Sequence, residues 1–81
     1  MQSDLLYHAL HREFPNLADA IGRLRHSDAH FAHLLEQHDA VDADITKSET
    51  GVAPMSDHSL EALKKQRLHL KDQLYRMAVA A

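Results

Sequence analysis

A heptad pattern of leucines between residues 60 and 77 constrains the fold of this 81-residue chain more than any other feature of its sequence. Apolar residues recur there at alternating steps of three and four, at Leu60, Leu63, Leu70, Leu74 and Met77. Arg67 takes the one position of the stripe that is not apolar. Such a stripe is the interface of an amphipathic helix with another helix. Because a lone helix cannot shield it from water, the chain must supply a second helix.

The region from residue 15 to residue 50 has the pattern of that second, longer helix. Its apolar residues follow the same alternating steps, and Asp28, His38 and Asp42 fill polar positions of the stripe. The apolar members are Leu17, Ile21, Leu24, Phe31, Leu35 and Ile45. As one continuous helix this region would be about 54 Å long at about 1.5 Å per residue.

Turn and capping residues divide the rest of the chain. Phe14-Pro15 starts the long helix, because proline suits the first turn and biases the residue before it towards an extended conformation. Gly51 is the expected C-terminal cap of that helix, and Ser56 or Asp57 the N-cap of the next. The predicted order is a short helix over residues 3–13, a long helix over 15–50, a loop over 51–56 and a last helix over 57–79.

A loop this short forces the two long helices into an antiparallel hairpin. If facing residue numbers sum to about 106, Leu70 faces Leu35 and Leu74 faces Phe31. The longer helix carries seven acidic and three basic residues and the last helix three acidic and five basic, which favours this pairing. We therefore predict an all-α fold: an antiparallel two-helix coiled-coil hairpin with a short N-terminal helical segment, in a single domain over residues 1–81.

Two charged residues in the stripes need an explanation. Arg67 is expected opposite Asp39 and Asp42, and it either pairs with one of these carboxylates or extends its guanidinium into solvent over an apolar stem. Asp28 either lies near Met77 and open solvent, or forms the rim of a surface that binds a partner.

The hairpin leaves apolar residues without a contact. The longer helix overhangs the shorter one, which would expose Leu17, Ile21 and Leu24. A second apolar stripe flanks the first on each helix, with Leu34 and Val41 on the long helix and Leu68 and Tyr75 on the short one. Either the N-terminal segment covers the overhang, or a second molecule does, and a symmetric dimer forming a four-helix bundle is the simpler expectation.

Eight histidines are a high number for a chain of this length. In one continuous helix His26, His30 and His33 would share a stripe, and two imidazoles one turn apart can chelate a divalent metal ion. These positions also fall on the outward face, where polar residues are simply solvated. With no cysteine and no HExxH-type motif, we expect no bound metal and no cofactor. The histidines leave a pH-dependent association open.

Other classes of function have little support in the sequence. The chain lacks a nucleophile motif and a phosphate-binding loop, and a helical hairpin offers no deep cleft, so we expect neither an enzyme nor a small-molecule substrate. Lys64, Lys65 and Lys71 could contact RNA, but acidic residues interrupt them and the net charge is −3. No apolar run is long enough to cross a membrane and no signal peptide is apparent, so a cytoplasmic protein is expected.

The order of motifs over residues 8–78 resembles the YdcH family of small bacterial proteins. The segment HREFPNLADAIGRLRHSDAHFAHLLEQHDAVDADI is followed by a short loop and by LEALKKQRLHLKDQLYRM. The most specific parts are Phe14-Pro15, the step from Asp28 to Phe31 with Leu35 after it, and the block KQRLHLKD over residues 65–72. His38 stands where many relatives would have an aromatic residue.

The resemblance implies a bacterial helical-hairpin protein without an assigned activity, and it provides no catalytic residues. It points to fold or partner contacts for Asp28, Phe31, Arg67, Leu70, Lys71 and Asp72. Combined with the stripes, these residues predict a non-enzymatic interaction protein that forms a homodimer or docks on a larger protein. The candidate seam and partner-binding residues are Leu17, Ile21, Leu24, Asp28, Phe31, Leu35, Asp42, Arg67, Leu70, Lys71, Asp72 and Leu74.

Overall fold

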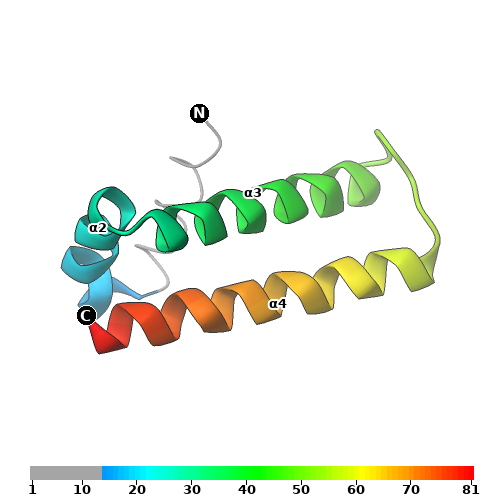
Figure 1. The fold of residues 1–81 in the computed structure, drawn as a ribbon. Helices are drawn as coiled ribbons and strands as arrows, with labels where there is room; N and C mark the ends of the chain where they lie inside the picture. The colour runs from blue at the N-terminus through cyan, green and yellow to red at the C-terminus, as the bar shows by residue number, and fades with distance from the viewer. Residues whose placement is uncertain (1–13) are drawn as a thin grey trace.

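The computed structural model describes residues 14–81, and within this range the chain is helical without any strand (Figure 1). The all-α prediction is therefore confirmed, whereas the helix predicted over residues 3–13 lies outside the described range. The elements in chain order are a 3₁₀ helix η1 (Pro15–Leu17), α2 (Ala18–Ser27), α3 (Ala29–Glu49) and α4 (Asp57–Ala80).

The helices α3 and α4 form the predicted antiparallel hairpin (Figure 1). Gly51 ends α3 with a φ of 81°, a left-handed conformation that glycine adopts without steric cost. The Gly51 amide donates to the carbonyl of Ser48, at 3.2 Å. Ser56 caps α4, because its hydroxyl accepts a hydrogen bond from the Ser59 amide. Both predicted capping residues of the loop are thus confirmed.

The continuous helix predicted over residues 15–50 is wrong, because the chain breaks at Asp28. This residue is extended, with φ −124° and ψ 107°, and it separates α2 from α3. Its carboxylate accepts a hydrogen bond from the Phe31 amide at 3.1 Å, so it caps the new helix. Asp28 is therefore the N-cap of α3, a role that the periodic pattern of the sequence does not predict.

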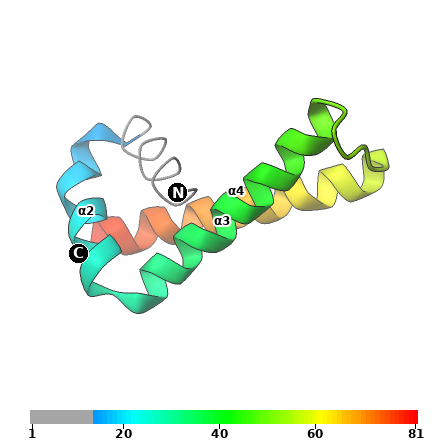
Figure 2. The same cartoon turned by 90° about the horizontal axis from the view of Figure 1, so that it is seen from above.

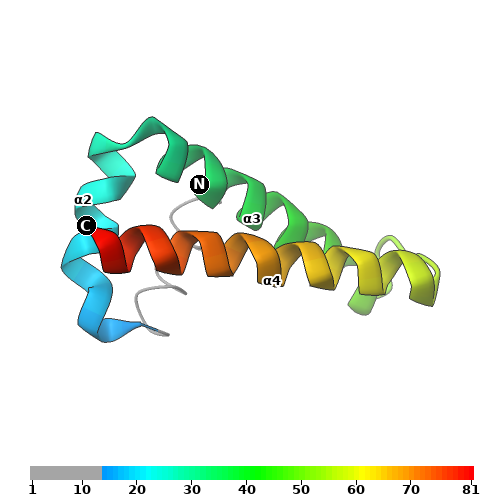
Figure 3. The same ribbon diagram turned by 60° about the horizontal axis from the view of Figure 1, so that its bottom comes forward.

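The break turns α2 across the open end of the hairpin, beside the C-terminal end of α4 (Figures 2 and 3). The molecule is only 38 Å in its longest dimension, well short of the predicted helix of about 54 Å. The overhang is consequently absent. Ile21 is 2% exposed, and Leu17 and Leu24 are half-buried against the core. The expectation that these three residues form an exposed docking patch is wrong.

The core lies between the three α-helices and includes most of the predicted stripe. Four of its side chains are fully buried, namely Phe31, Leu35, Ile45 and Leu74. Leu34 and Val41 are also buried, so the second stripe of α3 is closed, and His38 of the first stripe is 4% exposed. The second stripe of α4, in contrast, remains exposed. This helix therefore has a buried inner face and an exposed outer face.

Candidate interaction surface

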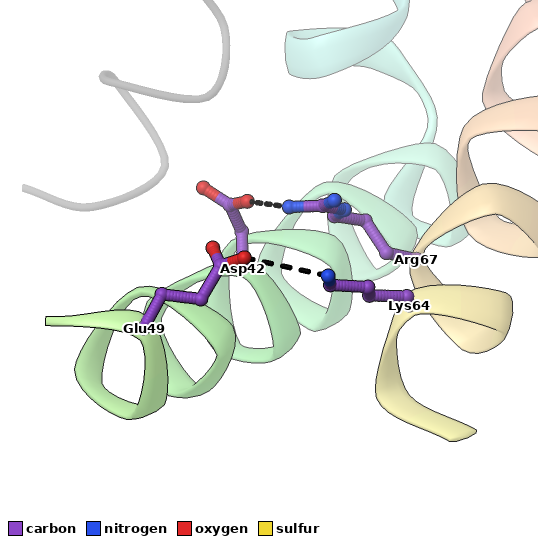
Figure 4. A network of polar contacts seen from close by, with 4 residues as sticks. All are labelled: Asp42, Glu49, Lys64 and Arg67. Carbon is purple, nitrogen blue, oxygen red and sulfur yellow. Dashed lines mark hydrogen bonds and ion pairs between the residues drawn. The ribbon is translucent and has the colours of Figure 1, made fainter. Parts of the chain in front are cut away.

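The polar residue of the α4 seam forms one of the two ion pairs predicted for it. The Arg67 guanidinium donates to the Asp42 carboxylate of α3 across 2.7 Å (Figure 4). The two side chains are 33% and 47% exposed, so each remains in contact with water at the edge of the seam. Part-exposed pairs of this kind contribute about 1 kcal/mol or less to stability, and their main effect is on the register of the two helices.

A second ion pair lies near the loop end of the hairpin. Lys64 Nζ of α4 lies 3.4 Å from a carboxylate oxygen of Glu49 of α3 (Figure 4). A register in which facing residue numbers sum to about 106 does not predict this pair, because it places other residues opposite Lys64. Together the two pairs engage Lys64 and Arg67 with acidic partners on the same molecule. This reduces the positive charge available for RNA on a helix that already carries interrupting acidic residues.

Two acidic groups of α3 interact next to the Arg67 pair. Burial, and secondarily the neighbouring Asp42 carboxylate, raise the pKa of Asp39 above its ordinary value. Because Arg67 pairs with Asp42, the electrostatic repulsion between the two carboxylates acts mainly on the half-buried Asp39. Arg67 therefore pairs with Asp42, and its alternative pairing with Asp39 is not formed.

The histidine stripe expected on the long helix does not exist. His26 belongs to α2, whereas His30 and His33 belong to α3 beyond the break at Asp28. All three are exposed. Over residues 14–81, no group of three or more histidine and acidic side chains is close enough to hold a metal ion.

An open hollow lies at the corner between α2 and α3. It is lined by Arg25, His26, Ala32, Leu35 and Glu36 and holds about 260 Å³. Binding sites for small molecules are usually about 300 to 1,000 Å³ and enclose most of the ligand. This hollow is smaller and open to solvent, so it does not provide the dry environment that catalysis on a small substrate needs.

The outer face of α4 carries the main apolar surface among the described helices. Three of its large apolar side chains are substantially exposed, with values of 59% for Leu68, 44% for Tyr75 and 54% for Val79. The Tyr75 ring packs against Phe14, at a centroid distance of 5.0 Å and an interplanar angle of 50°. We call Leu68, Tyr75 and Val79 the outer stripe. The seven-residue spacing of Leu68 and Tyr75 predicts the first two members of the outer stripe but not Val79.

The structure separates the other predicted site residues into two groups. Phe31, Leu35, Leu70 and Leu74 are buried and support the fold. On α4, Lys71 is half-buried and Asp72 is exposed beside the outer stripe. Of the candidate seam and partner-binding residues, only Asp72 is thus exposed.

None of the helices described over residues 14–81 is long and apolar enough to span a membrane. Residues 31–78 match a family model described as "Protein of unknown function (DUF465)". The chain is also similar to the uncharacterized protein YdcH of Escherichia coli (strain K12), with 30% identity over 64 residues that cover 79% of this chain and 86% of that protein. The YdcH protein of Shigella flexneri matches to the same extent. No solved structure matches.

The family match starts at Phe31 and ends at Ala78, so it covers the α3–α4 hairpin and leaves out α2. It includes the Arg67–Asp42 pair and two residues of the outer stripe, Leu68 and Tyr75. The matched region and the extent of the similarity to YdcH agree with the resemblance of the motifs. The chain therefore belongs to this YdcH-like family of proteins of unknown function.

Proposed function

We propose that this protein is a non-enzymatic interaction protein of the bacterial cytoplasm, and that it binds another protein through the outer stripe of α4. The observation that supports this proposal is the difference in exposure between the two faces of that helix. Leu70 and Leu74 on the inner face are 5% and 2% exposed, whereas Leu68 and Tyr75 on the outer face are 59% and 44% exposed. Exposed apolar side chains aligned along a helix are typical of a helix-binding surface.

The rest of the described molecule supports binding over catalysis. The hollow at the α2–α3 corner is open to solvent, and the exposed histidines are spread over α2, α3 and α4. A hairpin of this kind presents a helix face of fixed shape, because the buried seam and the two ion pairs hold α4 in one register on α3. No cofactor is required for this role.

Site-specific photocrosslinking in the native host tests the proposal. A photoreactive phenylalanine analogue at position 68 should form adducts with another protein chain, because Leu68 lies in the outer stripe. The matched control is position 66, since Gln66 is also exposed on α4 but points about 160° away around the helix. Adducts from position 68 alone are the expected result. Absence of adducts from position 68, or equal adducts from both positions, would contradict the proposal.

A further inference from the structure

The outer stripe has the spacing of a second helix-packing seam. Leu68, Asp72, Tyr75 and Val79 follow one another at steps of four, three and four. At about 100° per residue, these four side chains fall within an arc of about 60° on one side of the helix. That arc points away from the buried Leu70 and Leu74. In Figure 1, α4 forms the lower edge of the molecule and α3 lies above it.

One residue of this seam is already held in place. The Tyr75 ring packs against the Phe14 ring in a tilted arrangement, with a centroid distance of 5.0 Å, while 44% of Tyr75 stays exposed. An aromatic side chain that is ordered before binding loses less conformational freedom when a partner covers it. Tyr75 is therefore suited to be the central apolar contact of an interface.

We propose that the occupant of this seam is α4 of a second copy of the chain, packed antiparallel to the first. The proposal rests on the proposed function and specifies its partner. If facing residue numbers sum to about 147, Leu68 lies opposite Val79 of the second copy, and Tyr75 lies opposite Asp72. The two-fold symmetry repeats each contact, so all four residues of the seam have a partner.

The charges beside the seam favour this arrangement. Asp72 and Arg76 are both exposed and lie towards the same edge of the seam. In the antiparallel register, Asp72 of each copy is next to Arg76 of the other, which gives two reciprocal opposite-charge contacts. A parallel pair would instead bring Asp72 against Asp72 within the seam and place the two Arg76 side chains on opposite edges of the interface, so that no Asp72–Arg76 contact forms between the copies. Complementary charges at an interface select orientation in this way.

The small size of the contact favours a weak dimer. The segment from Leu68 to Val79 is about 18 Å long at about 1.5 Å per residue, shorter than α4 as a whole. An interface of this length is at the small end of specific protein contacts, which are weak and reversible. We therefore expect a dimer that dissociates on dilution and not an obligate one.

Exchanging the charges at positions 72 and 76 tests this pairing directly, because both partners are copies of the same chain. Asp72→Arg gives a chain with two arginines at the interface edge, and Arg76→Asp gives a chain with two aspartates. Each variant alone places like charges together, so its self-association should weaken by about tenfold or more, measured by sedimentation velocity over about a hundredfold range of concentration. An equimolar mixture should regain the wild-type affinity, because each arginine then meets an aspartate of the other chain. Gln66→Arg, on a different face, is the matched control and should associate like the wild type.

The outcomes separate this inference from the proposed function. Recovery in the mixture supports the antiparallel α4 dimer, provided that circular dichroism shows both variants to be as helical as the wild type. A wild-type chain that stays monomeric, or variants that associate normally, would overturn the dimer. If position 68 still forms adducts with a different protein, the outer stripe binds that protein and the proposed function stands without the dimer. If neither association nor adducts occur, both proposals fail.

Discussion

At the scale of single residues, Asp28 has the largest effect on the path of the chain. Its extended backbone ends α2, and its carboxylate accepts the Phe31 amide at the start of α3. Phe31 is completely buried, so the cap also fixes where α3 places its first core residue. This side chain thus caps α3 at the point where the chain turns and aligns its first core residue.

Replacing Asp28 with alanine should therefore destabilise the protein. Loss of an N-cap costs about 1 kcal/mol, because the Phe31 amide loses its acceptor. Urea unfolding followed by circular dichroism would measure the change. Asp28→Ser is the matched control, since serine is an equally good cap and should stay within a few tenths of a kcal/mol of the wild type. Equal stability of the alanine and serine variants would show that the cap is unimportant.

Asp39 gives a prediction about pH. Burial, followed by the neighbouring Asp42, raises the pKa of Asp39 above the ordinary 3.8, so the folded protein binds a proton at higher pH than the unfolded chain. By linkage, the ionised group destabilises the folded state at neutral pH, and this cost disappears once the pH falls below 3.8, where both states are protonated. Asp39→Asn should therefore be more stable than the wild type at pH 7, with a difference that shrinks on acidification.

Urea unfolding at several pH values would measure this difference. Asp44→Asn, which removes an exposed carboxylate from the same helix, is the control and should give a smaller gain at pH 7. If Asp39→Asn lost stability at neutral pH, or if both variants gained equally at every pH, the assigned cause of the pKa shift would be wrong.

At the scale of secondary structure, α4 has two faces with different roles. Leu70 packs into the core with 5% exposure, and Leu68, two residues earlier, is 59% exposed on the opposite side. The same helix therefore stabilises the hairpin with one face and leaves the apolar side chains of the other exposed.

A pair of aspartate substitutions tests this division. Leu70→Asp should unfold the hairpin, because it places a carboxylate in the core and costs more than about 4 kcal/mol. Leu68→Asp should keep its helicity and change the stability of the monomer by no more than about 0.5 kcal/mol. Thermal unfolding monitored at dilute concentration compares the two. A Leu70→Asp protein that melts like the wild type would mean that Leu70 is not in the core.

At the scale of the whole molecule, α2 closes the end of the hairpin. Ile21 is 2% exposed and belongs to the same core as Leu74 and Ala78. An apolar residue that a straight helix would have left in water is buried by turning the chain at Asp28. The gain from burying such a side chain is larger than the small cost of interrupting one helix.

Ile21→Ala should therefore be destabilising. Truncating a buried isoleucine costs about 2 to 5 kcal/mol, through lost burial and the cavity that remains. Val52→Ala is the control, because Val52 is 76% exposed in the loop between α3 and α4 and should change stability by less than about 0.5 kcal/mol. Chemical denaturation of both variants would measure the effect. Equal stability would indicate that α2 does not pack on the hairpin.

The fold is most predictable from the sequence where local chemistry decides the structure. Gly51 and Ser56 were identified as caps from their residue types, and the heptad leucines of α4 predicted its buried face. The break at Asp28 was missed because the apolar periodicity continues through it, and the only local signal was an aspartate in a stripe of apolar residues. Its cause is tertiary, since α2 turns to bury Ile21 on helices distant in sequence.

The candidate surface was predictable only in part, for a related reason. Both α3 and α4 carry a second apolar stripe in the sequence, and the pattern alone does not distinguish them. In the structure Leu34 and Val41 of α3 are buried, whereas Leu68 and Tyr75 of α4 are exposed. Which stripe remains open depends on how the whole chain packs.

The molar mass in solution, measured by light scattering over a range of concentrations, tests the central claim most directly. The account predicts that the wild type rises from 9.2 kDa towards twice that mass as concentration increases, because the outer stripe of one copy pairs with that of another. Leu68→Asp should remain folded and stay at 9.2 kDa, because a carboxylate would replace an apolar contact of the interface. Identical masses for the two proteins at every concentration would contradict the claim that α4 associates through its outer stripe.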